Sequence, residues 1–76
     1  MRDPALEAGF AAARSHIQAA LDELDGAGTA VDRGDLSGAV LRIAVELEMR
    51  LDQVDTDVIG IVERLEQLGD VHRSPA

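Results

Sequence analysis

Cysteine and lysine are both missing from this chain of 76 residues, and its only aromatic residue is Phe10. Without cysteine the chain forms no disulfide, and thiolate metal sites and cysteine nucleophiles are excluded. Seven arginines stand against fifteen carboxylates, which gives a formal net charge of -8. Because a phosphate backbone is bound by clustered cations, this balance argues against nucleic acid as a ligand.

Long apolar runs are missing as well. No stretch approaches the 18 or more uninterrupted apolar residues of a membrane span, and Asp3, Glu7 and Arg14 interrupt the first twenty residues. We therefore expect a soluble, cytoplasmic protein without a membrane partner. A domain of this size buries only about 60% of its unfolded surface, so a partner chain is the expected source of further stability.

The first half of the chain has the spacing of an amphipathic helix. Apolar residues recur at intervals of three and four from Leu6 to Val31, which predicts a helix over about 5–32. Asp3 can cap its start, where Pro4 has no amide to lose. Two glycines near its end, Gly26 and Gly28, leave open an alternative in which residues 25–35 form a loop.

A chain reversal is expected at residues 33–35, because Gly34 can adopt positive φ and Asp35 or Ser37 can cap a following helix. Beyond it, apolar residues keep one phase at about 100° per residue, which predicts a second helix over about 36–68 that ends at Gly69. Residues 70–76 are expected to form a flexible tail. The phase is kept by Leu36, Val40, Ile43, Leu47, Leu51, Val54, Val58, Val62, Leu65 and Leu68.

Residues 41–52 also alternate with period two, as a half-buried strand would. We favour the helix, because the residue types have high helix propensity and the helical phase continues beyond residue 52. A single strand would, moreover, have to pair with a second chain.

The predicted fold class is therefore all-α: one domain, an antiparallel two-helix hairpin. Leu41, Val45 and Met49 form a second apolar flank outside the main stripe, and one hairpin cannot cover both. The expected solution is a four-helix bundle, made by self-association or with a helical protein partner. The predicted interface consists of Leu41, Val45, Leu47, Met49, Leu51, Val54, Val58, Val62 and Leu65. Its predicted centre is formed by Leu47, Leu51, Val54, Val58 and Val62.

One stretch has the spacing of a calcium-binding loop. Asp55, Asp57, Glu63 and Glu66 match acidic ligand positions of an EF-hand, and Gly60 matches its invariant glycine. The fifth position is the apolar Ile59, so we favour an uninterrupted helix with an acidic outer face and expect no metal. A calcium-binding module that uses these four carboxylates is the alternative function.

Other chemistry has little support in the sequence. His16 has only alanines one turn away, His72 lies near the end of the chain, and both are expected to be solvated. The serines lie in no nucleophile elbow, and carboxylates two residues apart diverge on a helix. The sequence thus predicts a protein that is not an enzyme and needs no cofactor.

Two families show a resemblance. Leu21-Asp22-Glu23-Leu24 before the turn and Leu51-Asp52-Gln53-Val54-Asp55 after it resemble small helical-hairpin proteins of the ESX (type VII secretion) class, although Arg33-Gly34-Asp35 replaces their Trp-x-Gly turn. The turn region is also similar to the small subunit of exodeoxyribonuclease VII, in the spacing of Leu21, Leu24, Asp25, Asp32, Gly34 and Leu36; Glu48 stands in place of a glycine of that family. Both resemblances imply a protein that works by contact, either as a scaffold or as an accessory subunit of a larger enzyme.

Overall fold

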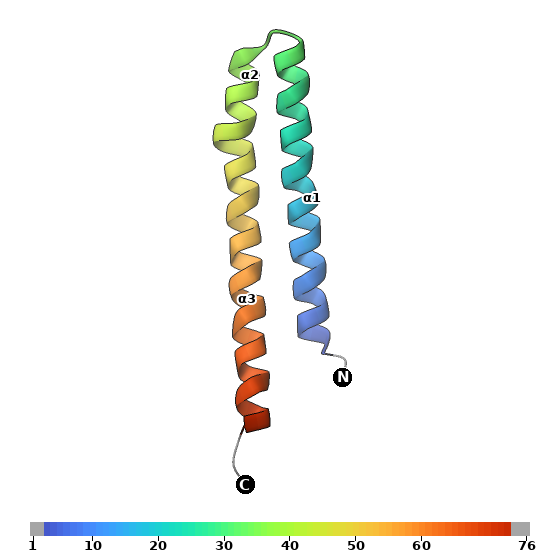
Figure 1. Ribbon diagram of the computed structural model, residues 1–76, viewed down its shortest axis with the longest axis vertical. Helices are drawn as coiled ribbons and strands as arrows, with labels where there is room; N and C mark the ends of the chain where they lie inside the picture. The colour runs from blue at the N-terminus through green and yellow to red at the C-terminus, as the bar shows by residue number, and fades with distance from the viewer. Residues whose placement is uncertain (1–2, 74–76) are drawn as a thin grey trace.

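The chain forms a single long hairpin of helices (Figure 1). The computed structural model describes the backbone of residues 3–73 and the side chains of residues 3–69. Helix α1 (Pro4–Asp32) runs antiparallel to a second arm made of α2 (Leu36–Leu41), a π-helical segment η1 (Arg42–Leu47) and α3 (Glu48–Arg73). The hairpin measures 65 × 19 × 11 Å, so it is one layer of two helices. The predicted all-α hairpin is confirmed.

Helix α1 begins as the sequence predicts. The side chain of Asp3 accepts a hydrogen bond from the amide of Leu6 at 3.0 Å, and Pro4 occupies the first turn. The alternative loop over 25–35 is wrong for its first eight residues, because α1 continues through Gly26 and Gly28 to Asp32. A glycine costs about 1 kcal/mol in a helix interior, which the packing of the second arm against α1 offsets here.

The turn is built by backbone hydrogen bonds. The amides of Gly34 and Asp35 donate to the carbonyls of Val31 and Ala30 at 2.9 and 2.8 Å. Gly34 has φ of 77°, the one positive φ among residues 3–73. Asp35 rather than Ser37 caps the second arm, since its Oδ1 accepts from the amide of Gly38 at 2.9 Å.

The second arm is helical throughout, so the strand alternative for residues 41–52 is wrong. The prediction that the apolar residues keep one unbroken helical phase is also wrong. The turns of η1 contain more residues than α-helical turns, so the direction in which side chains point shifts by about one residue across η1. Ala39 before η1 is buried and Leu47 at its end is half-buried, although they are eight residues apart in a helix pair whose repeat is otherwise seven. The π segment absorbs that extra residue and keeps both side chains toward α1.

Helix α3 extends to Arg73, past the predicted end at Gly69. Gly69 does not take the positive φ of a helix-ending glycine, and without that cap the helix continues. Residues 70–73 therefore continue the helix instead of beginning the predicted tail. Residues 74–76, the last part of the predicted tail, lie outside the described residues.

Gly60 lies within α3, and a Cβ added there would have no atom within 4 Å apart from its chain neighbours and the nearby backbone of its own helix. We expect Gly60→Ala to raise the free energy of unfolding by about 0.5 to 1 kcal/mol, through helix propensity and a less flexible unfolded chain. Thermal melts followed by circular dichroism measure the change. The control is Gly34→Ala, where positive φ makes alanine unfavourable and the melting temperature should fall. A clear loss of stability in Gly60→Ala would contradict a continuous helix at this position.

Candidate helix-association surface

Small side chains line the contact between the two arms. Ala13, Ala20 and Ala27 of α1 lie seven residues apart and are only 9%, 6% and 6% exposed. Near the open end of the hairpin, a Cβ added at Gly9 would lie 3.0 Å from Cγ1 of Ile61. The distance between packed helices depends on the side chains at the contact, and here small residues allow α1 and α3 to approach closely.

Across from these alanines, the second arm presents larger apolar residues with the same spacing, Leu47 from the end of η1 and the others from α3. Leu47, Val54, Ile61 and Leu68 are half-buried, and each lies seven residues from the next. We refer to this line of contact, with Ala13, Ala20 and Ala27 opposite, as the seam. No large side chain among the described residues is fully buried, so the seam by itself is a thin core.

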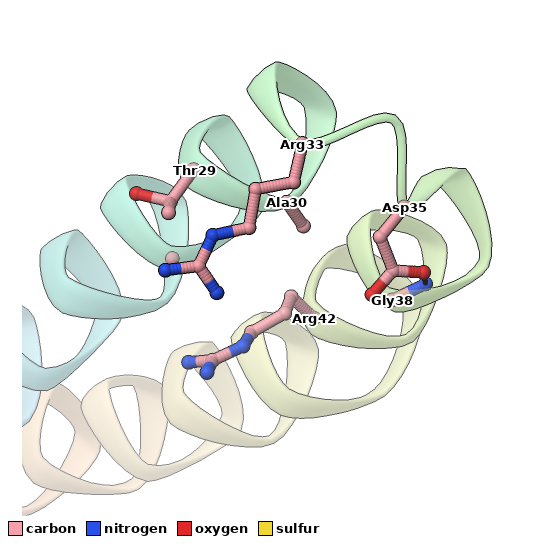
Figure 2. A pocket seen from close by; sticks show the side chains of 7 residues that line it. Thr29, Ala30, Arg33, Asp35, Gly38 and Arg42 are labelled. Atoms are coloured by element: carbon pink, nitrogen blue, oxygen red, sulfur yellow. Dashed lines mark hydrogen bonds between the residues drawn. The ribbon is translucent and has the colours of Figure 1, made fainter.

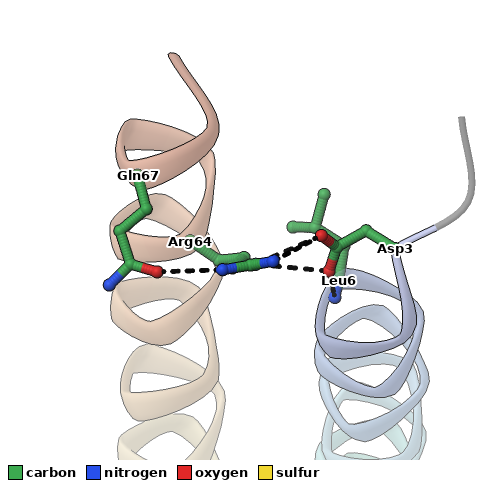
Figure 3. A network of polar contacts seen from close by, with 4 residues as sticks. All are labelled: Asp3, Leu6, Arg64 and Gln67. Atoms are coloured by element: carbon green, nitrogen blue, oxygen red, sulfur yellow. Dashed lines mark hydrogen bonds and ion pairs between the residues drawn. The ribbon is translucent and has the colours of Figure 1, made fainter. Parts of the chain in front are cut away.

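Ion pairs accompany the seam along its length. At the open end, Arg64 binds the cap residue Asp3, with Nη2 of Arg64 2.7 Å from Oδ2 of Asp3 (Figure 3). The same guanidinium donates to Gln67 at 3.2 Å. Asp3 thus both caps α1 and fastens it to α3, and its side chain is 8% exposed.

In the middle of the hairpin, Nδ1 of His16 donates to Oδ2 of Asp57 at 2.5 Å. The His16 side chain is one-third exposed and that of Asp57 is 16% exposed. The prediction that His16 is solvated is therefore wrong. Its partner is 41 residues away along the chain, on the other helix, where no local pattern could reveal it. The side chain of His72 lies outside the described residues.

Nearer the turn, Glu23 is bound by two arginines of the second arm. Its Oε1 accepts from Nη1 of Arg42 at 3.0 Å, and its Oε2 lies 3.5 Å from Nε of Arg50, an ionic contact too long for a good hydrogen bond. Arg42 passes over Gly26, where a Cβ would be 2.6 Å from its Nη1. A side chain at position 26 would displace the flexible end of Arg42, so Gly26 leaves room for the Arg42–Glu23 ion pair.

The seam takes up only part of the large apolar side chains, and most of the others lie outside it. Those of α1 and the second arm named below are each between 41% and 64% exposed. Two contacts fix where they point: His16 meets Asp57 and Glu23 meets Arg50 across the seam. The next residue in each helix is rotated by about 100°, and in antiparallel helices equal rotations lead to the same side of the pair. One side of the hairpin, the apolar face, is thereby formed by Phe10, Ile17, Leu21, Leu24, Val31, Leu36, Val40, Ile43, Leu51, Val58, Val62 and Leu65.

Near the turn, the apolar face is hollowed. Residues of both arms line an open hollow of about 510 Å³ with almost no polar surface. Its walls come from the end of α1, from α2 and from η1, so the two arms share this surface. The lining residues are Val31, Leu36, Ala39, Val40, Ile43 and Ala44.

The opposite side of the hairpin is polar. A recess of about 340 Å³ lies there, with the guanidinium groups of Arg33 and Arg42 and the carboxylate of Asp35 around it (Figure 2). Arg42 is engaged by Glu23, and Asp35 caps Gly38. These two contacts stabilise the turn.

The predicted interface residues divide into three groups. Leu47 and Val54 are half-buried in the seam, whereas Leu51, Val58, Val62 and Leu65 lie exposed on the apolar face. The second flank, Leu41, Val45 and Met49, lies on the other side, where Leu41 lines a recess with Glu23, Arg42 and Glu46. Sequence reasoning missed the α1 half of the apolar face. Its signal was the seven-residue spacing of Phe10, Ile17, Leu24 and Val31.

The calcium-loop alternative is wrong in its geometry. Residues 55–66 lie within α3 and form no loop. Asp57 faces α1 and binds His16, whereas Asp55, Glu63 and Glu66 are exposed. Within residues 3–69 no three histidine or acidic side chains are placed to hold a metal ion together.

Comparison with known proteins identifies no relative: no protein-family model matches the chain, and neither a curated protein nor a solved structure does so. The resemblances to ESX-class hairpins and to the exodeoxyribonuclease VII small subunit remain predictions. Over the described part of the chain, no helix has the length and apolarity required to cross a membrane.

The ion pair at the open end makes stability depend on pH. Hydrogen bonding from Arg64 first, and from the Leu6 amide next, holds the pKa of Asp3 below its usual range. A lowered carboxyl pKa stabilises the fold above the unfolded-state pKa of about 3.9, and this contribution is lost as pH falls through the lower folded-state pKa. We therefore expect Asp3→Asn to melt at lower temperature than the parent at pH 7 and to lose less stability between about pH 4 and pH 2. Asp52→Asn removes an exposed carboxylate as the control; equal acid sensitivity of parent and Asp3→Asn would contradict the assignment.

Proposed function

We propose that this protein works by contact: a non-enzymatic helical hairpin whose apolar face packs on the helices of another chain. The observation that supports the proposal most is that each helix uses one side to contact the other arm and exposes large apolar side chains on another side. Inside the hairpin the contact is made by alanines, by half-buried apolar residues of the second arm and by ion pairs, while twelve large apolar side chains remain exposed on one side.

The size of that surface favours association over catalysis. Twelve half-exposed side chains of about 80 Å² each offer on the order of 1,000 Å² of apolar area, which exceeds the largest patch of a typical monomer, about 300 to 600 Å². It is also enough for a standard interface of about 800 Å² per partner. Leaving such a surface in water is unfavourable, so a covering chain stabilises the hairpin.

Site-specific photo-crosslinking in the host cell tests the proposal. A photoreactive amino acid placed at Val58, on the apolar face, should give a covalent protein adduct. The matched control is the same amino acid at Ile59, the next residue, which is similarly exposed (52% against 45%) but points away from the face. The absence of adducts at Val58, or equal adducts at both positions, would overturn the proposed function.

A further inference from the structure

The π segment η1 places one extra residue between the two ends of the second arm. Arg42 and Arg50 both contact the carboxylate of Glu23, although they are eight residues apart. Ala39 is buried and Leu47 is half-buried against α1, with the same separation of eight. Positions of a regular α-helix that point in nearly the same direction are seven residues apart, so both pairs depend on η1.

The sequence itself has the seven-residue spacing. Val40 lies seven residues before Leu47, and Ile43 lies seven residues before Arg50. If the second arm were α-helical throughout, these two apolar side chains would therefore point toward α1. In the structure they belong to the apolar face instead, where they are 64% and 42% exposed.

The second arm thus has two arrangements that place different residues against α1. With η1 present, which we call the π register, Ale39-equivalent places are held by Ala39 and Arg42; in an unbroken helix, the α register, Val40 and Ile43 take these places. The π register is favoured by the ion pair in which Oε1 of Glu23 accepts from Arg42 at 3.0 Å. The α register loses this contact, because Arg42 is rotated by about 100°, but it buries two large apolar side chains.

We propose that η1 is a register switch: the second arm converts between the two registers, and the ion pair of Arg42 with Glu23 holds the π register. Val40 and Ile43 also line the apolar hollow, so conversion takes away part of the apolar face together with two walls of the hollow. The register therefore sets how much of the face another chain could contact, and this consequence alone rests on the proposed function. A role for η1 agrees with the frequent occurrence of π segments at functional sites.

Thiol labelling of single cysteines reads the register directly, since the natural chain has no cysteine. Val40 is 64% exposed, whereas Ala39 is 8% exposed. Val40→Cys should therefore react with a water-soluble maleimide about tenfold faster than Ala39→Cys, which becomes accessible only when the hairpin opens locally.

Arg42→Ala removes the ion pair that holds the π register. The labelling rate at position 39 should then rise severalfold and the rate at position 40 should fall severalfold, because the second arm turns position 40 inward and position 39 outward. Opposite changes are specific to the switch, since a hairpin that merely opens more often reacts faster at both positions. Arg33→Ala, which removes an exposed arginine near the turn, is the matched control and should leave both rates unchanged.

A locked form of the hairpin provides a second control. Deletion of Val45 removes one residue from η1, so Ala39 comes to lie seven residues before Leu47 and the second arm becomes α-helical with Ala39 still toward α1. This variant should keep the helicity of the parent by circular dichroism. In this background Arg42→Ala should change neither labelling rate.

The labelling rates decide the proposal without a partner chain. If Arg42→Ala raises both rates together, or leaves both as in the parent, the switch is overturned. If the rates change in opposite directions in the deletion background as well, the extra residue of η1 is not their cause and the proposal is also overturned. Failure of the contact function is distinct, since it removes the Val58 adducts and leaves the labelling rates unaffected.

Discussion

Val58→Asp should weaken association of the hairpin by about 100-fold or more. The side chain is 45% exposed in the single hairpin and belongs to the apolar face, so association would bury the new carboxylate among apolar groups. Burial of an unpaired charge, together with the loss of the valine contacts, is worth several kcal/mol, and each tenfold change in the dissociation constant corresponds to about 1.4 kcal/mol. Sedimentation velocity over a concentration series measures the effect.

Ile59→Asp is the matched control for this change. It adds the same negative charge at the next residue, which is 52% exposed and points away from the apolar face. Its dissociation constant should stay within about threefold of the parent's, since a surface substitution changes free energies by about 0.5 kcal/mol at most. Equal weakening by the two substitutions would show that net charge, rather than the apolar face, controls association.

The second large effect is expected at Glu23, whose side chain is 10% exposed and faces two arginines. Glu23→Ala should lower the free energy of unfolding by about 2 kcal/mol, because it removes a charge-assisted hydrogen bond and leaves Arg42 and Arg50 without their counter-charge. Denaturant unfolding at fixed protein concentration measures the loss.

Two variants separate the causes of that loss. Glu23→Gln keeps an acceptor for Arg42 but no charge, and it should fall between the parent and Glu23→Ala. Glu63→Ala removes an exposed carboxylate from α3 and should change stability by under about 0.5 kcal/mol. If Glu23→Ala were as mild as Glu63→Ala, the contact between the arms would not depend on this ion pair.

The hairpin itself could be predicted from the sequence, since helix phase, the Asp3 cap and Gly34 are local signals. The inside of the hairpin could not. Large side chains such as Leu51 and Val58 dominate the apolar periodicity, so the sequence pattern does not separate residues that lie between the two arms from residues on the exposed apolar face. The structure places alanines such as Ala20 between the arms instead, and alanine adds little to a hydrophobic pattern although it controls how closely helices approach.

Two further features were hidden for related reasons. The His16–Asp57 and Glu23–Arg50 pairs join residues far apart in the chain, so no single-helix spacing reveals them. The π segment shifts the direction of the following side chains by about one residue, and Arg42–Leu47 contains no glycine or proline that would indicate it. With this segment, Ala39 and Leu47 both face α1 although they are eight residues apart.

The dependence of thermal stability on protein concentration tests the central claim most directly. If a second chain covers the apolar face, folding is coupled to association, and the melting temperature of the unmodified protein should rise by several degrees over about a 100-fold increase in concentration. Circular dichroism at the helical minimum, from low micromolar to several hundred micromolar chain, supplies the curves. A cooperative melt whose midpoint stays the same over that range, with the mass of a single chain, would contradict self-association through the apolar face.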